Sequence, residues 1–150
     1  SRQRKMLAKQ IRKLDLEDYV LVLPAVPHHE IPELIAKADI CVAPLGLNDR
    51  NVTQGACPIK VLEYMAAGRP LLASNMPIVR ELLREDVDGL LFSPSDPDDL
   101  ARQANLLLKD VGLSKRLAES AAAHVREKFT WHESQKKLVK VYEKLVMRDS

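Results

Sequence analysis

The sequence predicts an α/β domain with a Rossmann-like, doubly wound parallel sheet and helices on both of its faces. Short apolar runs of strand length alternate with helical segments along the 150 residues, as in a series of βαβ units. The run at 20–26 is apolar throughout rather than alternating, which is typical of a parallel strand covered on both faces. The composition, 46% hydrophobic and 29% charged, is that of an ordinary globular domain.

The first part of the chain predicts two helices and two strands. Residues 3–14 show the spacing of an amphipathic helix. Its arginines and lysines are interpreted as a solvated face, and the helix is too mixed in character to predict membrane binding. A strand is expected at 20–26, a helix at 29–37 and a second strand at 39–45.

The second part continues the alternation. Strands are expected at 70–74 and 89–92, and the helix between them is expected to turn four apolar residues inward: Ile78, Val79, Leu82 and Leu83. Asp96 is predicted to cap the next helix, with Pro97 at its first position. Another helix presents an apolar stripe of Leu113, Leu117, Ala121 and Val125. A capping box that begins at Thr130 opens the last helix.

The most informative stretch is a polar loop followed by a short helix with defined ends, at 53–70. Pro58 suits the first helical position, because its missing N–H would be unpaired there in any case. Gly68 is expected just past the end of the helix in a left-handed conformation, and Pro70 prevents continuation. The helix is almost wholly apolar after its first turn except for Glu63, and a glutamate is rarely buried without a partner.

Two interpretations of Glu63 remain open. In one, Glu63 pairs with Lys60, three residues earlier on the same helix face. In the other, this face lines a ligand site: the helix N-terminus and Lys60 attract an anion, and Glu63 accepts hydrogen bonds from hydroxyl groups. The second arrangement would suit a phosphate followed by a ribose.

The ordered series of motifs resembles the donor-binding part of retaining, family-4-type glycosyltransferases of the GT-B fold. The segment P-x-K-x-x-E-Y-M-A-A-G-R-P at 58–70 lies between a strand–loop–helix–strand run at 20–44 and a strand, helix and D-G-L-L strand at 71–92. The resemblance covers nearly the whole chain. It implies that 1–150 is one domain, the C-terminal donor-binding part of a longer enzyme. The N-terminal acceptor domain and the first strands of the donor domain are expected to lie outside the chain.

The resemblance also implies the positions of a donor site. The turn formed by Pro24, Ala25 and Val26 would contact the nucleobase, although the residues alone favour a core position for Val26. Backbone amides at 56–59 would hold the diphosphate together with Lys60, and Glu63 would bind the ribose. The implied donor-binding residues are Arg50, Gln54, Gly55, Ala56, Cys57, Pro58, Ile59, Lys60 and Glu63. For Arg50, the residues alone fit a ligand contact and a solvated loop side chain equally.

Two positions depart from the family pattern. The family commonly has two glutamates eight residues apart. Counting back eight residues from Glu63 leads to Gly55, so the first glutamate of the pair is missing. Cys57 stands where related S-P-x-K sequences have serine, and Gln54 is a candidate for the missing hydrogen-bonding role. The resemblance therefore leaves the transferred sugar open.

The implied activity is that of a hexosyltransferase of polysaccharide biosynthesis, which moves a sugar from a nucleotide-diphosphate donor to a glycan or lipid-linked glycan with retention. No nucleophile or general base is assigned within the chain, and the chain alone is expected to be inactive. Two alternatives stay open. One is a GT-B nucleotide-sugar epimerase or a phosphorylase-like enzyme, and the other is a non-catalytic nucleotide-binding or interaction module with a degenerate donor loop.

Composition argues against several other classes of protein. A net charge of +2 and an aromatic content of 4% do not suggest a nucleic-acid partner. Two distant cysteines and four histidines lack metal-ligand spacing, so neither a metal nor another cofactor is expected. The cysteines also predict no disulfide framework and hence a cytoplasmic location, peripheral at the inner face of the membrane if the acceptor is lipid-linked. No apolar run approaches the roughly 20 residues that span a bilayer.

Overall fold

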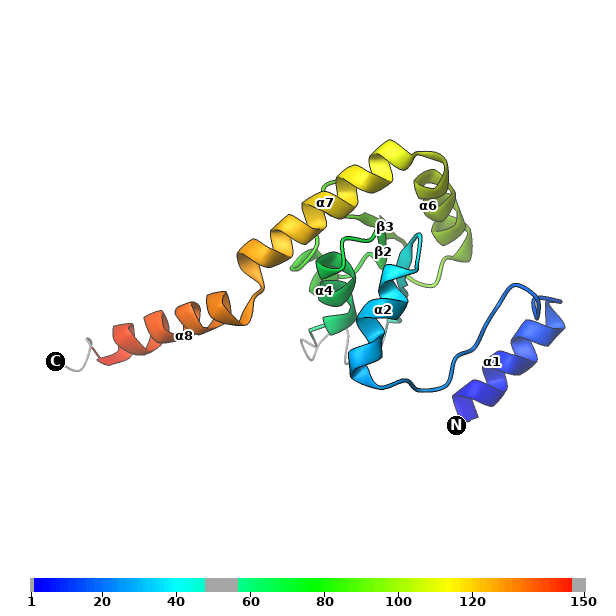
Figure 1. The fold of residues 1–150 in the computed structure, drawn as a ribbon, viewed down its shortest axis with the longest axis horizontal. Helices are drawn as coiled ribbons and strands as arrows, with labels where there is room; N and C mark the ends of the chain where they lie inside the picture. Colours follow the sequence, from blue (N-terminus) through cyan, green and yellow to red (C-terminus); the bar gives the residue numbers. More distant parts are fainter. Residues whose placement is uncertain (1, 48–56, 147–150) are drawn as a thin grey trace. The chain divides into compact units, whose positions relative to one another are not determined.

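The computed structural model describes residues 2–47 and 57–146, and it divides the chain into two compact units, Ser1–Ile31 and Pro32–Ser150. The first unit contains the helix α1 (Arg2–Lys13), drawn in dark blue in Figure 1. The prediction of a helix at 3–14 is thus confirmed to within a residue. Of its apolar stripe, Ile11 is buried, whereas Met6, Leu7 and Leu14 remain exposed.

The strand predicted at 20–26 is wrong for this structure. The segment carries no strand assignment, and Leu21 is 82% exposed. A parallel strand forms only where a neighbouring strand completes its hydrogen-bond ladder, and the described residues place none beside this segment. The helix predicted at 29–37 begins as a 3₁₀ turn, η1 (His28–Glu30), and continues as α2 (Ile31–Ala36).

The second unit is built on a parallel sheet of three strands, in the order β1 (Cys41–Ala43), β2 (Leu71–Ser74) and β3 (Leu90–Phe92). Cys41 pairs with Leu71, and Leu72 pairs with Leu90. The strands predicted at 39–45, 70–74 and 89–92 are therefore confirmed, the first of them shorter by four residues and the other two by one residue each. The helix α4 (Ile59–Ala66) connects β1 to β2, and α5 (Pro77–Arg80) follows β2.

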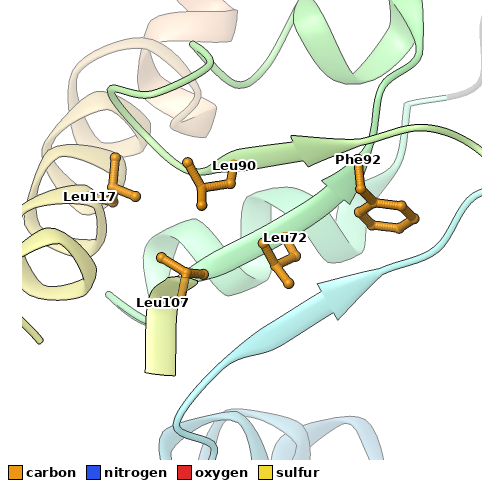
Figure 2. Packing of buried hydrophobic residues seen from close by; sticks show 5 residues of the cluster. All are labelled: Leu72, Leu90, Phe92, Leu107 and Leu117. Carbon is orange, nitrogen blue, oxygen red and sulfur yellow. The ribbon is translucent and has the colours of Figure 1, made fainter. Parts of the chain in front are cut away.

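Helices cover both faces of this sheet, as expected of a doubly wound fold. On one face, Leu72, Leu90 and Phe92 pack with Leu107 of α6 (Pro97–Lys109) and Leu117 of α7 (Val111–Lys128), as Figure 2 shows. Because side chains alternate along a strand, Leu71 and Ala73 face the other way. That side is covered by α4, which packs against β1, β2 and α7 and fully buries Val61 and Met65.

The ends of α4 differ in how well they are fixed. At its C-terminus Gly68 has a φ of +63°, its N–H donates to Met65 O at 3.0 Å, and the Arg69 N–H donates to Tyr64 O at 3.4 Å. This pair of bonds is a Schellman motif, so the predicted role of Gly68 is confirmed. At the N-terminus Pro58 is the N-cap, and the first helical residue is Ile59, one position later than predicted.

The other helix predictions also hold. Ile78, Val79, Leu82 and Leu83 are buried, although α5 itself ends at Arg80. Asp96 caps α6, because its Oδ1 accepts from the amides of Asp98 and Asp99 at 3.1 and 2.9 Å. The Thr130 hydroxyl accepts from the Glu133 amide at 3.3 Å and opens α8 (Trp131–Val146). No residue of α8 is buried within the described part of the chain.

Candidate functional site

The carboxyl ends of the three strands form one edge of the sheet, where open α/β sheets bind their ligands. Two structures lie at this edge. One is the N-terminal turn of α4, which is reached from the end of β1 through the segment 44–58. The other is a hollow on the α6 side of the sheet. They belong to opposite faces, so each is described by itself.

The hollow has a volume of about 300 Å³ and is mainly apolar. Ser74 anchors it: this buried side chain at the end of β2 accepts a hydrogen bond from the Leu45 amide at 2.8 Å and so holds the turn after β1. Phe92 of the core cluster and Leu100, which packs against that cluster, also line the hollow, as does Ser95, whose φ is +63°. The complete lining is Pro44, Leu45, Gly46, Ser74, Phe92, Ser95, Asp96, Pro97 and Leu100.

The α6 end of the hollow is unsuited to an anion. The first turn of α6 carries Asp98 and Asp99, and two of its amides already donate to Asp96. Asp99 also accepts from the Ser93 amide at 2.7 Å, the main cause of its lowered pKa. A phosphate placed here would meet carboxylates instead of free N–H groups.

The N-terminus of α4 has the opposite character. Its first turn carries no acidic residue, and within the described residues no side chain caps it. Ile59 and Lys60 of this turn are both exposed. The Ile59 amide donates to Cys57 O at 3.0 Å, and Pro58 has no N–H. Fewer backbone donors are therefore available at 57–59 than the sequence suggests, and Lys60 becomes the principal positive group.

Glu63 lies one turn further along α4. Successive helical residues are about 100° apart, which turns Glu63 away from the buried Val61 and Met65. The Glu63 side chain is half-buried. The neighbouring Tyr64 is affected by this carboxylate. Burial is the main reason why the pKa of Tyr64 is raised, and the charges of Cys41 and Glu63 raise it further. Lys60 and Glu63 thus share the side of α4 that is not used for packing on the sheet.

The remaining predicted site residues are only partly placed by the structure. Arg50, Gln54, Gly55 and Ala56 lie outside the described residues. Pro24, Ala25 and Val26 belong to the first unit, which is described separately from α4. The structure thus brings together only the positions on or next to α4: Cys57, Pro58, Ile59, Lys60 and Glu63.

A buried charge network lies elsewhere in the second unit and is not among the residues that the sequence singled out. The fully buried carboxylate of Asp88 accepts hydrogen bonds from Arg84 Nε and Nη2, both at 2.7 Å, and from Ser120 Oγ at 2.9 Å. His124 Nδ1 lies 2.7 Å from the same carboxylate. Burial opposes ionisation of Asp88, but these hydrogen bonds outweigh it and lower its pKa to about 2.

The serine, histidine and aspartate of this network do not form a catalytic triad. In a triad the serine hydroxyl bonds to the histidine, whose other nitrogen bonds to the carboxylate. Here Ser120 and His124 both contact Asp88, and no hydrogen bond joins the two among the described residues. The network instead ties α7 to the turn before β3. The signal in the sequence was slight, since Asp88 is 32 and 36 residues away from its partners on α7.

The two cysteines lie in different environments. Both are free thiols, Cys41 buried and Cys57 exposed. Burial raises the pKa of Cys41, an effect that Arg69 opposes. In the ranges that the structure describes, no three metal-ligating side chains gather in one place. No helix in those ranges has the length and apolar character required to cross a bilayer.

Comparison with known proteins gives a consistent picture. The sequence profile described as "Glycosyl transferases group 1" matches residues 1–124. A D-inositol 3-phosphate glycosyltransferase of Salinispora tropica is 32% identical over 129 residues, which are 86% of this chain and 25% of that protein. An uncharacterized glycosyltransferase of Methanocaldococcus jannaschii is 28% identical over 130 residues, 87% of this chain and 32% of its own length. The chain thus spans about a quarter to a third of these curated relatives.

Solved structures share the fold. The sucrose-phosphate synthase of Thermosynechococcus elongatus aligns with a TM-score of 0.81 and 22% identity, over 99% of this chain and 35% of that one. Anabaena HepE, solved in complex with UDP and glucose, aligns with a TM-score of 0.80 and 24% identity, over 93% of this chain and 36% of its own.

Proposed function

The chain belongs to the group 1 glycosyl transferases, and from this premise we propose that it binds the nucleotide-diphosphate sugar of a transferase at the N-terminal half of α4. The observation that carries the proposal is the position of Lys60 and Glu63 on the side of α4 that faces away from the buried Val61 and Met65, in a helix whose N-terminus meets the carboxyl edge of the sheet.

The charges at the two helix N-termini of this edge favour a donor whose diphosphate lies at α4 rather than at α6. The start of α6 is capped by Asp96 and carries two further acidic residues, whereas α4 begins without an acidic residue and with Lys60 in its first turn. A diphosphate is therefore stabilised at α4, by the positive end of the helix dipole and by the Lys60 ammonium. Glu63, one turn deeper, accepts hydrogen bonds from the ribose hydroxyls.

The reaction proposed for the complete protein starts from this placement. Charge develops on the leaving diphosphate as the sugar departs, and Lys60 with the helix N-terminus stabilises it electrostatically. We assign transfer of a hexosyl group with retention to a glycan or lipid-linked glycan, in polysaccharide biosynthesis in the cytoplasm. No metal takes part in this scheme. The segment that accompanies this domain in the longer relatives supplies the acceptor side.

The experiment is a calorimetric titration of the full protein with UDP, GDP and ADP. UDP comes first because HepE has been solved with UDP and with UDP-glucose. We expect one nucleotide to bind, and we expect both Glu63→Ala and Lys60→Gln to weaken it. Losing a hydrogen bond to a charged group lowers the affinity about 10- to 100-fold.

The matched control is Glu119→Ala, which removes an exposed helical glutamate from α7. Its nucleotide affinity should equal that of the unchanged protein. If no nucleotide binds the full protein, the proposal fails, and the loss of the family's first glutamate at Gly55 would identify a degenerate, non-catalytic module. Turnover of a bound donor without any acceptor would instead identify an epimerase.

A further inference from the structure

The charges of this chain are unevenly distributed. The whole sequence has 23 lysines and arginines against 21 aspartates and glutamates. Helix α1 holds six of the basic residues and no acidic one. The rest of the chain therefore carries 17 basic residues against 21 acidic ones. A single helix of 12 residues reverses the sign of the net charge.

Within α1 the basic residues are sorted by face. On a helical projection, five of them fall within an arc of roughly 100°: Arg2, Lys5, Lys9, Arg12 and Lys13. Ile11, the buried residue of the helix, lies outside this arc. Arg4 is also outside it and donates to Val22 O at 3.4 Å. We define these five residues as the cationic face of α1.

Among the described residues, the side chains of the cationic face take no part in ion pairing. All five side chains are exposed, and none forms an ion pair with any residue that the structure describes. The acidic residues nearest in sequence, Asp15, Glu17 and Asp18, follow the helix without pairing to it. By contrast, basic residues elsewhere are commonly paired, as Lys37 is with Glu33 and Lys136 is with Glu133.

We infer that the cationic face of α1 binds the surface of an anionic phospholipid bilayer. A bilayer is a flat anionic surface that meets a helix along one side, so one face of like charge matches it. Met6, which is 62% exposed and borders the arc by helical position, can enter the headgroup layer. Recognition of nucleic-acid bases would need aromatic or amide side chains on this face, and the face consists of lysine and arginine alone.

The test is sedimentation of the full chain with vesicles of phosphatidylcholine alone and of phosphatidylcholine mixed with an equal part of phosphatidylglycerol. The protein should sediment with the anionic vesicles only. The variant Lys5→Gln, Lys9→Gln, Arg12→Gln and Lys13→Gln should bind them at least about 100-fold more weakly, because each basic residue near a charged membrane contributes roughly a fivefold factor. Glutamine preserves helix propensity.

Two further variants show whether a loss of binding comes from the cationic face of α1 or from the total charge of the protein. Replacing Lys136, Lys137, Lys140 and Lys144 of α8 with glutamine removes the same charge from another exposed helix, and it should leave sedimentation nearly unchanged. Equal loss in both sets would overturn the proposal, because only the total charge would then matter. Exchanging Lys5, Lys9 and Lys13 for arginine should preserve binding, and its failure to do so would also contradict the proposal. Binding to a DNA duplex as tight as to anionic vesicles, at the same salt concentration, would replace the bilayer by a nucleic acid.

Discussion

At the scale of single residues, Asp88 has the strongest electrostatic role in the described structure. Its carboxylate has no exposed surface and holds Arg84, Ser120 and His124 through short contacts. Removing one partner from a buried charge network leaves the others without compensation. We expect Asp88→Asn to lower the free energy of unfolding by about 3 kcal/mol, measured by urea denaturation. A loss below about 0.5 kcal/mol would show that the network contributes little.

The same residue predicts how stability depends on pH. The pKa of Asp88 is lowered from 3.8 to about 2 in the folded state. The stabilisation is therefore complete at neutral pH and is lost as the pH falls from about 4 through 2, to an extent of at most about 2 kcal/mol. This is an upper bound, because Arg84 is 54% exposed and solvent screens its charge. Unfolding curves at pH 7, 4 and 2.5 would measure the loss, and Asp88→Asn should flatten this part of the profile.

Gly89 shows a second constraint at this scale. A Cβ at this position would lie 2.7 Å from the Leu71 carbonyl oxygen and 2.9 Å from Leu83 Cδ1. Since a backbone oxygen cannot move aside easily, Gly89→Ala should destabilise the protein by about 2–3 kcal/mol. Gly112→Ala is the control, because this glycine lies in the first turn of α7 and a Cβ there would meet only the Asp110 side-chain Oδ1, at 3.4 Å. It should raise the melting temperature while Gly89→Ala lowers it.

At the scale of elements, α4 depends on its C-terminal turn. The left-handed φ of Gly68 allows the Schellman bonds, and a Cβ there would meet only Ala122 at an ordinary 3.8 Å. Gly68→Ala should therefore cost about 1–2 kcal/mol through backbone strain alone. Gly68→Asn should cost less, because asparagine tolerates this conformation. If Gly68→Ala and Gly68→Asn lowered the stability equally in thermal unfolding, the loss could not be assigned to the positive φ at this position.

The contrast between Gly68 and Asp88 shows what the sequence could predict. The roles of Gly68 and Asp96 depend on partners within four residues, so a local pattern revealed both. The partners of Asp88 on α7 are more than 30 residues away, and only the folded chain brings them together. The predicted N-terminal limit of α4 was wrong by one residue, because Pro58 is the N-cap and the helix begins at Ile59.

At the scale of the whole molecule, the fold class was predictable and one strand was not. Three apolar runs found partners in a parallel sheet, whereas the run at 20–26 found none among the described residues. Apolar character gives a segment the capacity to form a strand, but hydrogen-bond partners decide whether it does. Of the predicted donor site, the structure describes together only the positions at α4, since it describes neither 48–56 nor the position of 24–26 relative to that helix.

Hydrogen exchange tests the status of 20–26 directly. In the described structure, no backbone hydrogen bond satisfies the amides of Leu21 to Leu23, whereas β2 lies between two strands. Amides of Leu71 to Ser74 should therefore exchange at least about 1,000-fold more slowly than those of Leu21 to Leu23. Slow exchange at Leu21 to Leu23 would mean that another strand pairs with them in solution.

The contacts that hold α4 in place also affect how a ligand would bind to this helix. The Schellman turn at Gly68 fixes one end of the helix, the packing of Val61 and Met65 fixes its side, and the Cys41 amide holds Pro70 O at 2.8 Å immediately before β2. Glu63 is consequently carried on a helix that is held at its C-terminal end and along one side, whereas Lys60 lies in the first turn, which no described side chain caps. Little conformational entropy of the helix backbone would be lost on association, so affinity would depend mainly on the contacts themselves.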